Sequence, residues 1–284
     1  MSSATAEAAR LAAPVRTGWR LTPHSAVAVV GAEVRKGLTK QLANPIAHVV
    51  TLVFAASMFL GLQWIMGQGA LRHDLLPMTI VGISSYWFLH FASLVMITDL
   101  VEEKRGGTFA QAQLTPSPLW VVMIGRLLTA SVFGLVVSLV GTLVPMLVTG
   151  TTIPLKAAAL VPYALILVNA LVFTLMMAAL ALSSPMVAVL ESLLTTLVLL
   201  LNGAFLPVSL YPDWMAVIAR LLPTTMGVDA TGKVLFKDKS LADIWSDGTL
   251  PWLLVYTAAL TLAGCALFVR NHRKALRDGK LGQY

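Results

Sequence analysis

The sequence predicts an all-α polytopic membrane protein, and three observations support this fold class. First, 57% of the 284 residues are hydrophobic and only 12% are charged, whereas a soluble domain carries about 25% charged residues. Second, apolar stretches of about 20 residues recur, which is the length that a helix needs to cross a bilayer. Third, the basic residues flank these stretches, so the net charge of +7 reflects membrane topology rather than binding of nucleic acid.

Six apolar segments have the length expected of a membrane-spanning helix. They cover residues 45–66, 75–101, 119–149, 157–182, 186–206 and 250–269. An even number of spans places both termini on the same side of the membrane. Of the 20 Lys and Arg residues, fourteen fall on the side of the termini and six on the other side. The positive-inside rule therefore predicts that both termini are cytoplasmic.

The segments outside the spans differ in character. Residues 1–23 are polar and basic and predict a disordered cytoplasmic tail, and residues 271–284 predict a basic cytoplasmic tail after the transmembrane domain, 43–270. Residues 24–42 have apolar side chains at helical spacing, which predicts an amphipathic helix on the membrane surface. The stretch 207–249 is in part too short and polar to cross, so we expect it to dip into the outer leaflet or to cap the protein.

No set of residues in the sequence predicts catalysis. The single cysteine, Cys265, lies in an apolar run, and the five histidines form no pair at metal-ligand spacing. The segment 227–233 resembles a phosphate-binding loop, but Val234 replaces the Ser or Thr that would hold magnesium. We therefore expect no enzymatic activity, and no cofactor or metal bound by this chain.

Polar side chains follow one helical face in each of two predicted spans. They are Thr79, Tyr86, His90 and Ser93 in the second span, and Glu191, Thr195 and Asn202, with Ser184 before them, in the fifth. Steps of three, four and seven residues place the members of each set on one face. Such groups are costly in lipid unless they face protein or water. Packing between helices is favoured for the Ser and Thr residues, whereas for His90 and Glu191 a substrate path and helix packing both stay open.

The connection between the second and third spans combines charge, a turn and a short helix. It begins with four charged residues, Glu102 to Arg105, and continues with Gly106-Gly107 and Thr108. Thr108 would cap a short helix that Thr115-Pro116 ends, because a residue before proline is disfavoured in the helical region. This helix could dock a soluble partner, or the segment could be an ordinary solvated loop.

These residues resemble the membrane-spanning permease subunits of type-2 ABC exporters, of a drug-resistance-like subgroup. The family pattern is an acidic residue, Gly-Thr, a short helix ending in Thr-Pro, and Gly-Arg or Gly-Lys at the next span. The matching residues are Glu102, Gly107-Thr108, Leu114-Thr115-Pro116 and Gly125-Arg126. A second block, from Asn202 to Ala230, resembles the family's fifth span and outer re-entrant hairpin, although Thr231-Gly232 stands where the family often has Arg. The resemblance covers residues from about 25 to 270.

The resemblance implies a coupling helix that contacts a cytoplasmic ABC ATPase subunit, present in two copies, which binds the ATP and magnesium. The coupling residues would be Glu102, Glu103, Lys104, Arg105, Gly107 and Thr108. A second permease subunit, identical or paralogous, would complete the pathway, and the polar faces described above would line it. The expected location is the plasma membrane of a bacterium.

The function implied is export of a small amphiphilic compound, a drug or a lipid. Export of a polysaccharide or a lipid-linked glycan is an alternative on the same scaffold, and it would call for an aromatic passage such as Tyr86, Trp87 and Phe88. An alternative of another class is an ion-coupled carrier with Glu191 and His90 as its proton relay.

Overall fold

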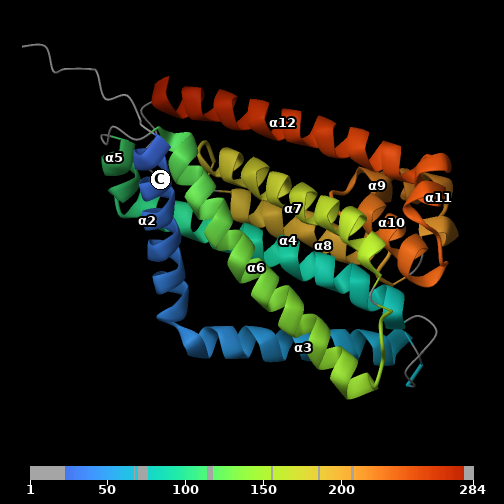
Figure 1. Ribbon diagram of the computed structural model, residues 1–284. Helices are drawn as coiled ribbons and strands as arrows, with labels where there is room; N and C mark the ends of the chain where they lie inside the picture. Colours follow the sequence, from blue (N-terminus) through green and yellow to red (C-terminus); the bar gives the residue numbers. More distant parts are fainter. Residues whose placement is uncertain are drawn as a thin grey trace, which may run out of the picture.

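The computed structural model describes residues 23–66, 68–69, 76–113, 118–154, 156–184, 186–205 and 208–277. All regular structure in these residues is helical (Figure 1). The predicted disordered tail lies outside the described residues, except for Pro23, which begins the first described helix. The helices are α2 (Pro23–Leu42), α3 (Pro45–Met66), α4 (Leu76–Arg105), α5 (Thr108–Gln113), α6 (Leu119–Thr149), η1 (Ala157–Ala159), α7 (Leu160–Ala181), α8 (Val187–Leu201), η2 (Val208–Leu210), α9 (Asp213–Leu221), α10 (Thr225–Phe236), α11 (Leu241–Ser246) and α12 (Thr249–Arg277).

Five helices in the described part of the chain are long and apolar enough to cross a membrane: α3, α4, α6, α7 with η1, and α12. Each coincides with a predicted span, and α3 and α6 have the predicted bounds. The helix α4 continues past residue 101 to Arg105, and α12 continues past residue 269 to Arg277. The α4 extension consists of Glu, Lys and Arg, and the α12 extension is rich in Arg and Lys. These residues have high helix propensity, so the helix continues where the chain becomes charged. The first half of the predicted basic tail is therefore helical, and residues 278–284 lie outside the described residues.

The fifth predicted span, 186–206, is not a complete membrane-spanning helix. Only Val187–Leu201, the helix α8, is helical. These 15 residues extend about 22 Å, short of the ~30 Å of a hydrocarbon core. Asn202 ends the helix because its side-chain oxygen accepts a hydrogen bond from the Ala204 N–H at 3.0 Å, and Gly203 adopts a φ of +88°. The six-span prediction thus corresponds to five long helices and one short helix.

The helix α4 forms the centre of the bundle, since 89% of its most apolar window is buried. It packs against α6, α7, α8 and α10. The contact with α6 includes a hydrogen bond that the Ser138 hydroxyl donates to the Ser84 carbonyl at 2.8 Å. By contrast, only 12% of the apolar window of α3 is buried. The residues that follow α4 along the chain are therefore held on a rigid, well-packed helix.

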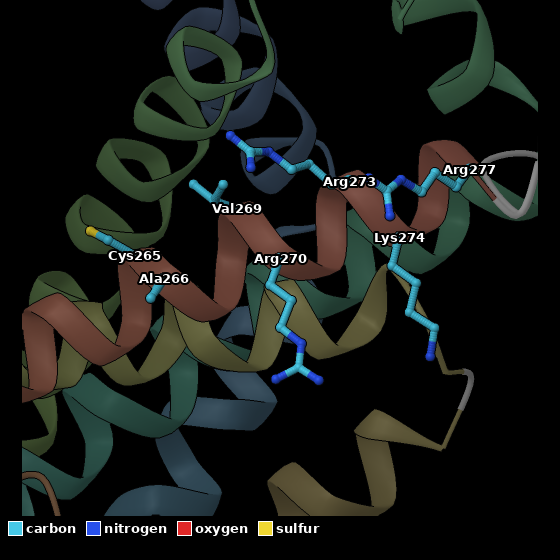
Figure 2. Close-up of a pocket in the computed structure, with 7 residues that line it drawn as sticks. All are labelled: Cys265, Ala266, Val269, Arg270, Arg273, Lys274 and Arg277. Carbon is cyan, nitrogen blue, oxygen red and sulfur yellow. The ribbon is translucent and has the colours of Figure 1, made fainter.

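The two ends of the bundle differ (Figure 1). The helix α2 lies across one end, together with α5 and the last turns of α12; we call this the α2 end. The predicted amphipathic helix, 24–42, is thus a real helix and lies where the long helices end. Figure 2 shows the last turns of α12, with Arg270 and Lys274 extending from the helix beside a surface hollow of about 810 Å³.

The helices α9, α10 and α11 lie at the opposite end, which we call the α10 end (Figure 1). The predicted outer segment, 207–249, corresponds to these helices. Its first helix, α9, leaves Trp214 and Leu221 exposed, whereas α10 is mostly buried against α7 and α4. The segment therefore combines a surface helix with one that is part of the packed bundle.

Candidate functional site

The loop between α4 and α5 is positioned by the end of α4 and by a glycine turn. Gly107 has a φ of +71°, which an L side chain rarely adopts. The Thr108 hydroxyl donates a hydrogen bond to the Glu103 carbonyl at 3.3 Å, and this contact fixes the start of α5 against the last turn of α4. Leu114-Thr115-Pro116, which would end the short helix, lie outside the described residues.

An ion cluster joins this loop to α2 and α6. The Glu103 carboxylate accepts hydrogen bonds from Lys36 of α2 at 2.7 Å and from Arg126 of α6 at 2.5 Å. Arg126 also lies 3.6 Å from Glu33 of α2. Because the Arg126 side chain is only 7% exposed, its pairing with Glu103 is shielded from water, and loss of either partner would leave a buried charge unpaired. The cluster therefore fixes the position of α2 relative to the loop.

Lys40 of α2 extends the same cluster along α4. Its ammonium donates hydrogen bonds to Asp99 at 2.5 Å and to Glu102 at 2.7 Å. Partial burial disfavours the charged ammonium, but the two carboxylates outweigh this effect and raise the pKa of Lys40 above 10.5. These charged side chains surround a hollow of about 310 Å³ between α2, α4, α5 and α6.

The six predicted coupling residues do not all face the same way. Lys104 is 2% exposed, and it donates hydrogen bonds to the carbonyls of Ala181 and Leu182, at the end of α7. A cation at the C-terminus of a helix can hydrogen-bond the last free carbonyls of that helix and interacts favourably with the helix dipole. Lys104 and Glu103 thus serve internal contacts, whereas Glu102 and Arg105 are exposed. Thr108 is exposed as well, and Glu102 also accepts the hydrogen bond from Lys40, so the six residues divide between internal contacts and the surface.

The structure brings the two ionisable groups of the candidate path together. His90 Nδ1 of α4 lies 3.5 Å from Glu191 Oε1 of α8, and the Glu191 side chain is only 5% exposed. Tyr86 stacks on His90, with ring centroids 5.6 Å apart. Neither His90 Nδ1 nor Glu191 Oε1 has a hydrogen bond within the described residues, so this pair is a close contact between α4 and α8 rather than a hydrogen bond.

The other residues predicted to line the path make hydrogen bonds between or within helices, or are buried. The Ser93 hydroxyl pairs with Thr174 of α7 at 3.0 Å, so Ser93 faces a different helix from His90. The Asn202 amide donates a hydrogen bond to the Gly82 carbonyl of α4 at 2.9 Å. Thr195 donates back to the Glu191 carbonyl within α8. The remaining member of the set, Thr79, is also buried.

The three neighbouring aromatic residues of α4 do not form a common surface. Trp87 and Phe88 are 2% and 1% exposed, and both lie in the hydrophobic core. Only Tyr86 accompanies His90 towards α8.

Two features were not identified from the sequence: the ion cluster around Arg126 and the buried amide of Asn169. Arg126 matched the family pattern, but its role as the centre of an ion cluster depends on α2 crossing α6. Asn169 of α7 is fully buried, and neither polar atom of its amide has a partner in the described residues. An Asn in an apolar span is the signal that could have identified it.

Comparison with known proteins identifies the family. Residues 34–236 match the family described as ABC-2 type transporter, and this range holds more than half of the chain, including the α4–α8 contact and every member of the ion cluster except Glu33. The chain belongs to the ABC-2 type transporter family. It is therefore a membrane transport component rather than an enzyme, and permeases of this family work with ATPase subunits. No curated protein and no solved structure matches the chain.

Proposed function

We propose that this ABC-2 permease is a subunit of an ATP-driven exporter that moves a small amphiphilic compound, a drug or a lipid, out of the cytoplasm or the inner leaflet. A separate ATPase subunit would dock at α5 and the exposed residues Glu102 and Arg105. The single observation that carries the proposal is the ion cluster, because it connects this exposed turn to α2 and α6 through Glu103 and Arg126.

The continuous helix α4 supports a mechanism for the coupling. Its 30 residues extend about 45 Å, from the proposed docking turn to the α10 end. Force applied at Arg105 would move α4 as a rigid body and change the contact between His90 and Glu191 of α8. Two permease subunits, identical or paralogous, would enclose the pathway, and two ATPase subunits would bind the ATP and magnesium and supply the force.

Charge reversal at the exposed turn tests the docking. The variants Glu102→Lys and Arg105→Glu both leave the Glu103–Arg126 pair intact. Glu102→Lys also removes the hydrogen bond from Lys40, so Arg105→Glu is the cleaner variant and should insert and fold normally. We expect both variants to lose the ATPase subunit on purification, and to lose ATP-dependent transport of an amphiphilic dye into inverted vesicles. Lys239→Glu, at the α10 end, is the control and should retain both. Unchanged recovery of the ATPase subunit with Arg105→Glu would show that the turn is not the docking site.

The ion-coupled carrier is a second candidate because of the His90–Glu191 contact. A proton relay needs two such groups within reach of each other, and they lie 3.5 Å apart. This function predicts that Glu191→Gln abolishes transport and that a protonophore abolishes it too, while a non-hydrolysable nucleotide has no effect. The exporter predicts the reverse for the protonophore and the nucleotide. The glycan alternative has less support, because Trp87 and Phe88 are packed in the core.

A further inference from the structure

A third cavity lies at the α10 end, away from the ion cluster and from the His90–Glu191 contact. It has a volume of about 830 Å³, and residues of α4, α9, α10, α12 and the break after α8 line it. This volume lies within the range of small-molecule binding sites. The cavity is thus large enough for a ligand and is built from several elements rather than along one helix.

The charged side chains around this cavity are not balanced. Lys233 is neutralised locally, because it donates a hydrogen bond to the Thr249 hydroxyl at 2.5 Å and lies 3.4 Å from Asp229 and 3.6 Å from Asp247. The side chains of the other two lining cations, Arg220 and Lys237, have no ion pair or hydrogen bond in the described part of the chain. Both are exposed. The cavity therefore presents two cations that a bound anion could neutralise.

The rest of the wall is largely apolar. Met78 of α4, Met226 and Phe236 of α10, and Trp252 of α12 line the cavity. The hydroxyl of Thr225 also belongs to the wall; it is 1% exposed and has no hydrogen-bond partner within the described residues. Buried polar groups are nearly always hydrogen-bonded in proteins, so a ligand group that reached this hydroxyl would satisfy a polar atom that lacks a partner among the described residues.

We propose that this cavity binds an anionic amphiphile, a molecule with one carboxylate or phosphate head and an apolar tail. The head would pair with Arg220 and Lys237, and the tail would pack against the Met, Phe and Trp side chains. An uncharged ligand would leave the two cations without a counter-charge, and a free inorganic anion would leave the apolar wall exposed to water. The proposal concerns binding alone, so it goes beyond the proposed function and does not depend on the ATPase subunit.

Tryptophan fluorescence of the purified full chain, in nanodiscs of zwitterionic lipid, tests the proposal. Dibromostearate quenches a Trp residue that it touches, and its methyl ester is the uncharged probe of the same shape. We expect saturable quenching by the acid, with weaker binding of the ester. Trp252→Phe should remove most of this saturable signal, which separates Trp252 from the other six of the seven Trp residues.

The double variant Arg220→Gln/Lys237→Gln should weaken binding of the acid by about tenfold or more without changing binding of the ester. The matched control, Arg270→Gln/Arg273→Gln, removes two cations at the α2 end (Figure 2) and should leave both affinities unchanged. In the unmodified chain, raised salt should weaken binding of the acid only, a measurement that needs no variant. Equal affinities for acid and ester, or full displacement of the acid by inorganic phosphate, would overturn the proposal.

Discussion

Arg126 shows how one side chain can join three helices at the α2 end. Its guanidinium lies on α6, bonds to Glu103 of α4 and lies beside Glu33 of α2. The close crossing of α2 and α6 depends on the preceding residue, Gly125, because a Cβ atom there would lie 2.6 Å from the Glu33 Cβ. The Gly-Arg pair thus combines a steric and an electrostatic requirement at one point.

Removal of this guanidinium should destabilise the protein more than removal of a surface cation that bonds to the same carboxylate. Arg126→Gln leaves Glu103 without its buried partner, and we expect a loss of about 1–3 kcal/mol. Lys36→Gln removes the other cation on Glu103, but the Lys36 side chain is 58% exposed, so the expected loss is about 0–1 kcal/mol. Thermal unfolding midpoints in detergent measure the stability of the two variants. Equal losses for Arg126→Gln and Lys36→Gln would show that burial of Arg126 does not strengthen its contribution.

Lys40 should make stability depend on alkaline pH. Its pKa is raised in the folded protein above the ordinary 10.5, so the ammonium stabilises the fold fully below that value. This stabilisation is lost as the pH rises through the folded pKa. The difference in unfolding midpoint between the unmodified chain and Lys40→Met should be constant from neutral pH to about pH 10 and shrink above it. If this difference in midpoint grew as the pH rose above 10, the pKa of Lys40 would not be raised in the folded protein and the prediction would be wrong.

At the scale of elements, the end of α8 depends on its contact with α4. The chain after Leu201 is buried but not helical, which is tolerated at membrane depth only where protein covers the backbone. The Asn202 amide bonds to the Gly82 carbonyl, and Gly82 also permits the approach, since a Cβ atom there would lie 2.5 Å from the Ala204 Cα.

Gly82→Ala should therefore disrupt this contact. The added methyl group meets backbone atoms that have little room to move, so we expect a loss of about 1–3 kcal/mol together with lower transport. Gly61→Ala is the matched control, because nothing lies within 4 Å of a Cβ atom at that position of α3. It should be neutral or stabilising by up to about 1 kcal/mol. Equal unfolding midpoints for the two variants would show that the α4–α8 approach is not tight.

At the scale of the whole molecule, hydropathy alone predicted the five long helices, because long apolar runs leave few alternatives to a membrane span. The helical spacing of apolar side chains predicted α2. Hydropathy overestimated the span at 186–206, since it does not register that Asn202 and Gly203 redirect the backbone. Helical periodicity placed Ser93 on the same face as His90. It could not show that Ser93 contacts α7 while His90 contacts α8, because that depends on how the helices pack. The segment proposed for coupling was identified from the sequence, while the division of its side chains into inward-facing and outward-facing ones required the contacts of Glu103 and Lys104.

The bundle also predicts which positions lie on opposite sides of the membrane. In a Cys265→Ser background, Arg105→Cys marks the α2 end and Lys239→Cys marks the α10 end. A membrane-impermeant maleimide added to intact cells should label Lys239→Cys only, and permeabilised cells should show both. Labelling of Arg105→Cys in intact cells would reverse the orientation and remove the basis for docking an ATPase subunit there.

The shortness of α8 has a consequence for how the chain is made. A segment of 15 helical residues is too brief to be stable among lipids alone, and the carbonyls that follow it need partners. Those partners belong to α4, which the ribosome completes more than eighty residues earlier. During synthesis α4 is therefore already present when α8 emerges and can pack against it. A circular permutant in which α8 is made before α4 should fail to integrate into the membrane.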